Sequence, residues 1–270
     1  MQIRKVVLFG HGVTGEALST YLEVKNPNLE IAIRDPKKGF EDNILGAQFA
    51  FICVPVPVSD DYKQDLTMVM DCLERTHPTT IPIIRSTMAP GTIAKLEAQF
   101  KRPIVHMPEF LTARKSMADM FDHTNMYLGY NPDDGQFVNR MISLEDIFPD
   151  KIFTHCRSDE AEMIKLMHNC FGAMKVTFFN AVRNFCDHKA VDYETVRRGI
   201  LTVTDFISAE HTQVPGPDGR FGYGGTCFPV NIRAMIGVTK GYPLHEWLKL
   251  TEQHNFFNRE MNEILKGEQP

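Results

Sequence analysis

One of the six cysteines lies in a setting that suits covalent chemistry. Cys227 lies in the glycine-rich stretch 221–231 (FGYGGTCFPVN), and we expect a helix to begin just after it, around Pro229. Glycines before a cysteine can bring backbone N–H groups close to a ligand, and a helix N-terminus favours the thiolate. Such a thiolate can attack an aldehyde or carry an acyl group. The remaining cysteines are interpreted as small buried hydrophobic residues, namely Cys53, Cys72, Cys156, Cys170 and Cys186.

Two polar residues interrupt a long apolar helical pattern. Lys165 and Asn169 are four residues apart, so they share one helix face. A buried lysine that faces a cleft can stabilise an oxyanion. The alternative is a lysine that extends its amine out of the core beside a solvated asparagine. Glu109 follows a predicted strand, and on its own it is an ordinary carboxylate at a strand end.

A third constellation lies at the N-terminus. Residues 10–15 (GHGVTG) fit the pattern GxGxxG between a predicted strand and a predicted helix, and Asp35 lies 20 residues beyond Gly15 at the end of the second strand. This context is typical of a dinucleotide-binding turn, where the pyrophosphate lies at the helix N-terminus. Asp35 would accept hydrogen bonds from ribose hydroxyls and repel a 2′-phosphate, which favours NAD over NADP. The predicted contacts are Gly10, Gly12, Val13, Thr14, Gly15 and Asp35.

The elements that position these residues change character along the chain. Helical patterns at 14–24, 66–75 and 91–100 alternate with apolar runs that predict strands at 5–10, 30–34, 48–54, 81–86, 103–107, 126–129 and 151–154. This alternation predicts an α/β fold of the Rossmann type, a parallel sheet with helices on both faces. From residue 158 to about 189 a long helix without proline is predicted, followed by helices around 193–203, 232–239 and 243–265.

The predicted organisation is therefore a dinucleotide-binding domain at 1–156 and an all-helical domain at 157–270. Residues 214–228 contain five glycines and two prolines, so we expect an irregular loop there. The chain of 270 residues has 43% hydrophobic residues, 23% charged residues and a net charge of −5. This balance is typical of a soluble globular protein and gives no footprint for nucleic acid. With no signal peptide, membrane span or CxxC pair, we expect a cytoplasmic protein with free thiols and no metal site.

Five segments resemble, in the same order, the motifs of one enzyme family. The segment 222–229 (GYGGTCFP) resembles the GFGGSCFPKD motif of the nucleotide-sugar dehydrogenases, which oxidise UDP-glucose, GDP-mannose or UDP-N-acetylmannosamine. The other four are 51–57 (FICVPVP), 86–92 (STMAPGT), 108–111 (PEFL) and 161–169 (AEMIKLMHN). The resemblance extends from Met1 to about Ile264 and is closest to the UDP-glucose 6-dehydrogenase family.

The resemblance implies a function in nucleotide-sugar metabolism, of the kind that supplies polysaccharide biosynthesis. An NAD-dependent oxidoreductase would convert the sugar alcohol to a uronic acid by two hydride transfers, through a thiohemiacetal and a thioester on Cys227. It implies that Lys165 and Asn169 support the oxyanion and that Glu109 assists attack by water, with Asn231 a further catalytic position. It also implies cofactor contacts from Val54, Pro55 and Thr87, and substrate contacts from Phe110, Leu111, Tyr223, Gly224 and Gly225.

The chain departs from the family pattern in three places. Val230 and Asn231 stand where the motif has Lys-Asp, and asparagine cannot accept a proton as that aspartate can. Ala113 stands where the family often has a second glutamate. The chain ends at Pro270, so we expect a short form without the family's C-terminal nucleotide-sugar-binding domain.

Two other functions remain open from the sequence. One is a β-hydroxyacid type of dehydrogenase with a single hydride transfer, which also pairs lysine and asparagine on a long helix but needs no thiol. The other is a catalytically impaired protein that binds NAD or a nucleotide sugar.

A homodimer built on the helical half is also expected, because the long helix and the last helix show more apolar surface than a lone chain should expose. The family resemblance points to the same pairing. The alternative is a monomer whose last helix folds back on the long one. The apolar residues of the last helix are Trp247, Leu248, Leu250, Phe257, Met261 and Ile264.

Overall fold

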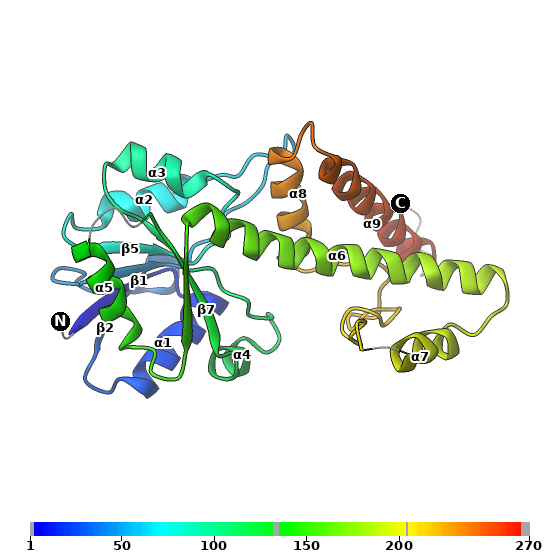
Figure 1. The fold of residues 1–270 in the computed structure, drawn as a ribbon, viewed down its shortest axis with the longest axis horizontal. Helices are drawn as coiled ribbons and strands as arrows, with labels where there is room; N and C mark the ends of the chain where they lie inside the picture. Colours follow the sequence, from blue (N-terminus) through cyan, green and yellow to red (C-terminus); the bar gives the residue numbers. More distant parts are fainter. Residues whose placement is uncertain (1–2, 132–134, 204, 266–270) are drawn as a thin grey trace. The chain divides into compact units, whose positions relative to one another are not determined.

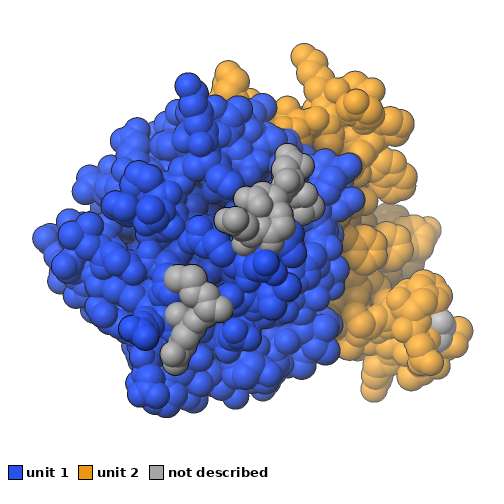
Figure 2. Space-filling model, turned by 60° about the vertical axis from the view of Figure 1, so that its left-hand side comes forward, with its two compact units in different colours: residues 1–59, 64–165 blue, residues 60–63, 166–270 orange. Residues whose placement is uncertain are grey.

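The computed structural model describes residues 3–131, 135–203 and 205–265, and of residues 135, 136 and 263–265 it describes the backbone alone. The chain divides into two compact units (Figure 2), which are described separately. The sheet unit comprises Met1–Ser59 and Gln64–Lys165, and the helical unit comprises Asp60–Lys63 and Leu166–Pro270. The division falls inside helix α6 (Ser158–His188), whereas the last strand ends at Cys156, where the sequence predicts the domain boundary.

In the described part of the sheet unit, eight strands form one sheet in the order β3-β2-β1-β4-β5-β6-β7-β8. Pairing is parallel except between β2 and β3 and between β6 and β7. The predicted α/β fold with a mostly parallel sheet is therefore confirmed, and the seven predicted strands are present. The strands are β1 (Lys5–Phe9), β2 (Glu30–Asp35), β3 (Phe40–Glu41), β4 (Phe49–Ile52), β5 (Ile81–Ile84), β6 (Val105–His106), β7 (Asn125–Gly129) and β8 (Ile152–Cys156).

Two apolar layers cover the faces of this sheet (Figure 1). Helices α1 (Val13–Lys25), α4 (Ser116–Asp122) and α5 (Gly135–Glu145) pack on one face, and α2 (Thr67–Arg75) and α3 (Thr92–Phe100) pack on the other. The central strands β4 and β5 are buried on both faces, which explains their uninterrupted apolar sequences. The sequence analysis did not predict β3, α4, α5 or the short 3₁₀ helix η1 (Pro36–Lys38). β3, α4 and η1 are short, so hydrophobic periodicity gives little signal there, whereas α5 has apolar residues at helical spacing (Phe137, Met141 and Leu144) that the sequence analysis missed.

The helical unit contains the rest of α6, then α7 (Tyr193–Val203), α8 (Phe228–Val238) and α9 (Pro243–Leu265). Helix α8 begins at Phe228, four residues before the predicted span 232–239 but just after Cys227, where the sequence predicts a helix start around Pro229. The described part of the segment between α7 and α8 has no regular structure, as the glycines and prolines predict. No helix among the described residues is both long enough and apolar enough to span a membrane.

A short segment far from α8 in sequence belongs to the helical unit. The Tyr62 hydroxyl donates to Glu252 (2.9 Å), and Lys249 Nζ donates to the same hydroxyl (2.7 Å). Arg233 of α8 pairs with Asp60 (3.0 Å). These contacts explain why Asp60–Lys63 groups with α8 and α9. Tyr62 adopts a left-handed φ of 64°, which is uncommon for a bulky side chain.

Candidate functional site

The glycine turn between β1 and α1 has the geometry that a dinucleotide requires. Gly10 has a φ of +85°, and a Cβ there would lie 2.8 Å from the carbonyl oxygen of Cys53. A Cβ at Gly15 would overlap the carbonyl oxygen of Gly10, so β1 and α1 approach closely only with glycine at this position. Gly12 caps α1 without any side-chain cap, and a Cβ there would meet nothing within 4 Å. The N-terminus of α1, with Val13 and Thr14 in its first turn, is thus open to an anion.

Asp35 ends β2, as predicted, and lies beside this turn. Its Oδ2 accepts a hydrogen bond from the backbone N–H of His11 at 2.8 Å. The bond ties the carboxylate to the glycine turn and leaves its other oxygen, Oδ1, available for a ribose hydroxyl. The residues at this position therefore fit the adenosine half of a dinucleotide.

The ends of β4 and β5 are joined by side chains at the same edge of the sheet. The Ser86 hydroxyl donates to the carbonyl of Val54 (2.6 Å), which precedes the exposed Pro55. Gln64 binds the segment after β5 at two points, since its Nε2 donates to Thr87 O (3.0 Å) and its Oε1 accepts from Ala89 N–H (2.7 Å). Thr87 is half-buried and is held at this edge by its backbone.

Glu162 also binds the segment after β5, through the backbone N–H groups at the start of α3. The sequence analysis did not single out this residue. It is fully buried in the first turns of α6. Its Oε2 accepts from Gly91 N–H at 2.6 Å, and its Oε1 accepts from Ile93 N–H at 2.7 Å. The carboxylate thus satisfies donors at the start of α3. Burial raises the pKa of Glu162 to about 7, although the two N–H bonds act in the opposite direction.

The shifted pKa predicts a pH dependence of stability. Because the folded-state pKa exceeds that of a glutamic acid in an unfolded chain, the stability linked to Glu162 is fully present below about pH 4.3 and is lost as the pH rises towards 7. Across that window the loss is on the order of 3 kcal/mol. Glu162→Gln should therefore flatten the plot of unfolding free energy against pH, measured by urea titration. The exposed Glu160 on the same helix is the control, and an unchanged slope in Glu162→Gln would refute the assignment.

One turn further along α6, Lys165 forms a buried ion pair. Its Nζ lies 3.4 Å from Glu109 Oε1, and the side chains of lysine and glutamate are 3% and 13% exposed. The same ammonium lies 5.2 Å from the ring centroid of Phe110. Glu109 Oε2 accepts from Leu111 N–H at 2.6 Å, which fixes the carboxylate. The alternative of a lysine that reaches out to solvent is therefore wrong, because its amine is buried against a carboxylate.

Near this pair lies a second buried cation. Arg85 is 2% exposed, and its Nε and Nη1 have no acceptor among the described residues. Burial lowers the pKa of Arg85, whereas nearby Cys53 and Glu109 raise it. A cavity of about 30 Å³ lined by Arg85 and Glu109 is large enough for one water molecule. His106 is also buried, and desolvation lowers its pKa to about 3, so the ring is neutral.

In the helical unit, Asn169 and Asn231 are both buried. Asn169 lies one turn beyond Lys165 on α6, and its Oδ1 is 3.0 Å from His168 Nδ1. Asn231 lies one turn beyond Cys227 on α8 and donates its N–H to the Cys227 carbonyl at 2.9 Å. Asn169 therefore shares a helix face with Lys165, as the sequence predicts, and Asn231 lies one helical turn from Cys227.

Cys227 occupies the N-cap position of α8, as predicted. Among the six free cysteines it is the one classed as exposed. Burial raises the pKa of Cys53, Cys72 and Cys170 to about 12, so those thiols stay protonated. Cys227 is thus the exposed thiol, and it lies at the N-terminus of α8.

The glycines before Cys227 differ in what they face. Gly222 and Gly224 lie against side chains of α9, whereas a Cβ at Gly225 would meet nothing within 4 Å. Tyr223 is buried, and its N–H is bonded to Asn255 (2.6 Å). The predicted substrate contacts in this loop are Tyr223, Gly224 and Gly225. Of the two glycines, only Gly225 has open space where a Cβ would lie. Among the described residues, no group of three or more His, Cys, Asp or Glu is placed to hold a metal ion.

The sheet unit is thus a dinucleotide-binding α/β unit, and the helical unit presents a thiol at a helix start. Residues 24–145 match the NAD binding domain of the UDP-glucose/GDP-mannose dehydrogenase family, and residues 159–260 match the central domain of the same family. The chain belongs to this family, and its cofactor is NAD.

Among curated proteins, the chain is similar to UDP-glucose 6-dehydrogenases. It is 25% identical to the protein of Streptococcus pneumoniae over 243 residues, which cover 86% of this chain and 59% of that protein. It is 27% identical to YwqF of Bacillus subtilis over 216 residues, which cover 74% of this chain and 46% of that protein. The chain therefore spans about half the length of the curated relatives it matches.

Solved structures share the fold. A UDP-glucose dehydrogenase from Pyrobaculum islandicum superposes with a TM-score of 0.78 at 19% identity, covering 95% of this chain and 68% of that one. A UDP-D-ManNAc dehydrogenase from Pyrococcus horikoshii gives a TM-score of 0.72 at 17% identity, covering 93% and 68%. At these identities the likeness concerns the fold alone, and it confirms the predicted arrangement of a Rossmann-type domain followed by helices.

Proposed function

We propose that this chain carries the cofactor-binding and thiol-bearing parts of an NAD-dependent nucleotide-sugar 6-dehydrogenase. The substrate is a UDP-glucose-like nucleotide sugar, and the product is its uronic acid. The observation that supports this most is the exposed Cys227 at the N-cap of α8 in a chain of this family. A single hydride transfer would need no such thiol.

The proposed reaction oxidises one primary alcohol carbon twice. NAD, when bound, accepts the hydride in each oxidation. After the first oxidation gives an aldehyde, the Cys227 thiolate forms a C–S bond to its carbon. The thiohemiacetal that results has the correct oxidation level for the second hydride transfer. That transfer leaves a thioester, and water then displaces the thiolate of Cys227 and releases the carboxylic acid.

The charges around Glu109 suit these steps. The Lys165 ammonium, buried in the described structure, can stabilise the oxyanion that forms as sulfur or water adds to the carbonyl. Glu109, held by Leu111 N–H, can take a proton from the attacking water. Asn169 and Asn231 can donate or accept hydrogen bonds but cannot take a proton, so we assign proton transfer to Glu109.

A panel of nucleotide sugars tests the proposal. The protein is incubated with NAD and each sugar, NADH absorbance is followed, and the product is identified by mass spectrometry. Formation of a uronic acid from at least one sugar supports the proposal. NAD binding without NADH formation from any sugar would favour the impaired binding protein instead.

The first prediction concerns the choice of cofactor. We expect NAD to bind at least tenfold more tightly than NADP, because the Asp35 carboxylate repels a 2′-phosphate and accepts from the ribose. Asp35→Ser should lower the ratio of the NADP dissociation constant to the NAD dissociation constant, as measured by calorimetric titration of both cofactors. Asp42→Ser is a matched control, since Asp42 also binds a backbone N–H beside β2, that of Ile33 (2.8 Å). Equal affinity of the unmodified protein for NAD and NADP would contradict the role of Asp35.

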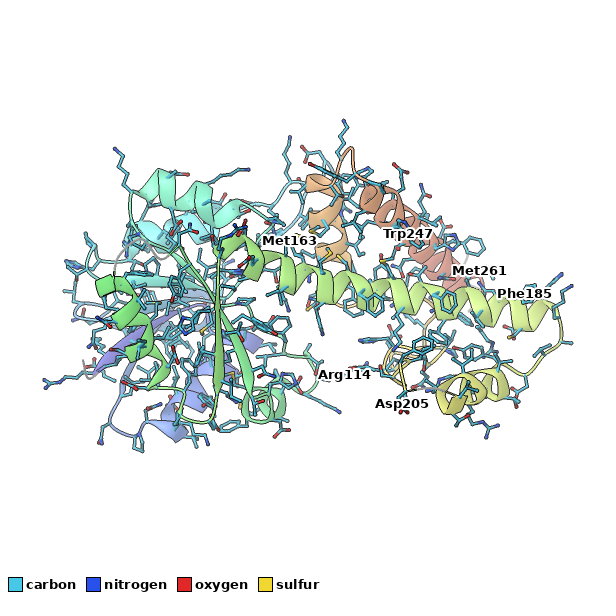
Figure 3. The ribbon with its side chains drawn as sticks, viewed as in Figure 1. Arg114, Met163, Phe185, Asp205, Trp247 and Met261 are labelled. Atoms are coloured by element: carbon cyan, nitrogen blue, oxygen red, sulfur yellow. The ribbon has the colours of Figure 1, made fainter. Side chains whose placement is uncertain are left out.

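We also propose that the protein is a homodimer that pairs through α6 and α9. Phe171, Phe178 and Phe185 are 69%, 60% and 63% exposed, and their spacing of seven residues places them along one stripe of α6. The large exposed apolar residues of α9 add to this surface, and Figure 3 labels Phe185 and Trp247. They are Trp247, Leu250, Phe256 and Phe257; Leu248 is buried, and the Ile264 side chain lies outside the described residues.

The proposed dimer predicts that one charge introduced into the phenylalanine stripe of α6 changes the oligomeric state. The unmodified protein should sediment at twice the 30.8 kDa of one chain. Phe178→Glu should give the monomer, because a buried unpaired carboxylate costs several kcal/mol at an interface. Tyr242→Glu, at an exposed aromatic outside the stripe, should leave the dimer intact. A monomeric mass for the unmodified protein at micromolar concentration would defeat the proposal.

The six free cysteines fit a reducing compartment. We propose a cytoplasmic location on this ground.

A further inference from the structure

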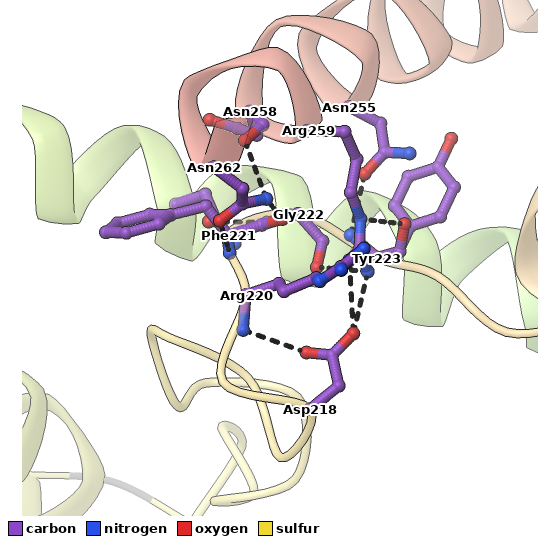
Figure 4. A network of polar contacts seen from close by, with 10 residues as sticks. Asp218, Arg220, Phe221, Gly222, Tyr223, Asn255, Asn258, Arg259 and Asn262 are labelled. Carbon is purple, nitrogen blue, oxygen red and sulfur yellow. Dashed lines mark hydrogen bonds and ion pairs between the residues drawn. The ribbon is translucent and has the colours of Figure 1, made fainter. Parts of the chain in front are cut away.

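A row of asparagines on α9 binds the loop that precedes Cys227 (Figure 4). Asn255 and Asn262 are seven residues apart and lie on the same face of the helix. Tyr223 N–H donates to Asn255 Oδ1 at 2.6 Å, and Phe221 N–H donates to Asn262 Oδ1 at 2.8 Å. Asn262 Nδ2 also donates to the Phe221 carbonyl at 3.0 Å. The side chains of α9 thus replace the backbone partners that an irregular loop lacks.

The N–H between these two is also bonded to an asparagine. Gly222 N–H donates to Asn180 Oδ1 of α6 at 2.8 Å, and Asn180 is buried. Three consecutive backbone donors of the loop are therefore fixed by side chains from two helices. These three hydrogen bonds to helix side chains hold the loop in one conformation.

Arg259, between the two asparagines on α9, completes the arrangement. Its Nε donates to the Tyr223 carbonyl at 3.0 Å, and its Nη2 donates to the Gly222 carbonyl at 3.2 Å. Nη1 and Nη2 both lie 3.1 Å from Asp218 Oδ2. One planar guanidinium thus joins two successive carbonyls and a carboxylate, a geometry that the point charge of a lysine reproduces only in part.

The contact between α9 and the loop explains why residues 222 and 224 of the loop are glycines. A Cβ at Gly222 would lie 2.6 Å from Asn255 Oδ1, and a Cβ at Gly224 would overlap Arg259 Nη2. Gly222 also has a φ of +76°, which disfavours any other residue. Gly222 is therefore favoured by its positive φ and by the close approach of α9, and a Cβ at Gly224 would displace the Arg259 guanidinium, whereas Gly225 remains open to a ligand.

We propose that Arg259 is a positioning residue for Cys227. The proposal rests on the proposed function, in which Cys227 is the nucleophile. Arg259 fixes the carbonyls of Gly222 and Tyr223, so only Gly224, Gly225 and Thr226 lie between an anchored residue and the cysteine. Without the guanidinium the loop loses its contacts to Asp218 and to both carbonyls, and Cys227 samples a wider range of positions. A nucleophile displaced by about 1 Å loses about 10²-fold in rate.

The test compares Arg259→Met with Arg259→Lys and with Glu260→Gln, an exposed neighbour on α9 as control. Hydrogen exchange is followed by mass spectrometry on the peptide that covers residues 216–227, without any substrate. Arg259→Met should speed exchange in this peptide, while the control matches the unmodified protein. In the full enzyme Arg259→Met should lower kcat about 10²-fold with KM little changed. Arg259→Lys should restore part of kcat, which a purely structural role would not predict.

Gly224→Ala gives a second, independent perturbation, because it displaces the guanidinium and keeps the arginine. It should speed exchange in the same peptide. Exchange in both variants equal to that of the unmodified protein would overturn the proposal, and so would faster exchange spread evenly over α6 to α9. If no nucleotide sugar is oxidised by the unmodified protein, the proposed function fails, and the exchange result still decides whether Arg259 fixes the loop.

Discussion

Cys227→Ala is expected to abolish formation of the sugar acid, with a loss of about 10³-fold or more. Cys53, Cys72 and Cys170 cannot substitute, since burial raises their pKa to about 12. Without sulfur the thioester cannot form, so the reaction should stop at the aldehyde level. The measurement is a chromatographic assay of acid and aldehyde after a fixed time.

Cys156→Ala serves as the matched control, because Cys156 is partly buried on β8 and carries no proposed role. It should leave acid formation unchanged. Cys227→Ser should behave like the alanine variant, since a serine hydroxyl is a weak nucleophile without a strong base beside it. Acid formation by Cys227→Ala at the rate of the unmodified protein would remove the cysteine from the mechanism.

Lys165→Met is expected to lower kcat by about 10²–10³-fold, the usual effect of removing an oxyanion donor. The ammonium is buried beside Glu109 at 3.4 Å, so its loss also leaves a carboxylate without its partner. Part of the effect could then come from lower stability, because an unpaired buried charge is costly. A urea titration of Lys165→Met gives the folded fraction under assay conditions, and kcat per folded molecule then separates the two contributions.

The expected outcome is that Lys165→Met stays mostly folded under assay conditions and that its kcat per folded molecule is still lowered. Lys175→Met is the control on the same helix, where the lysine binds the carbonyl and hydroxyl of Ser208 at 2.8 and 2.9 Å. That variant should keep full kcat. An unchanged kcat per folded molecule in Lys165→Met would show that Lys165 has only a structural role.

Local signals predicted the glycine turn between β1 and α1 and the position of Asp35 at the end of β2. The GxGxxG turn, the acid at the end of the second strand and the strands around them are all encoded within a few residues of each other. The start of a helix at Cys227 was equally local, since Pro229 favours the first turn. These features need no knowledge of distant contacts, so their sequence pattern predicts their structure.

The residues that hold the site in place could not be predicted in the same way. Arg259 contacts carbonyls of residues 36 and 37 positions earlier, and nothing near it in the sequence indicates that contact. Polar residues on an amphipathic helix are ordinarily interpreted as its solvated face. Glu162 resembles a common acidic residue in the first turns of a helix, yet it is fully buried against the start of α3. Two signals were available: its position three residues before Lys165 and its place in the family-like segment 161–169.

The stoichiometry of NADH tests the central claim most directly. The protein is incubated with excess NAD and a limiting amount of the nucleotide sugar that the panel identifies, and NADH and product are quantified at completion. The account predicts two NADH for each sugar consumed and one uronic acid formed, because both oxidations occur on the same carbon. One NADH per sugar, with an aldehyde or ketone as product, would contradict it and would favour the single-step dehydrogenase.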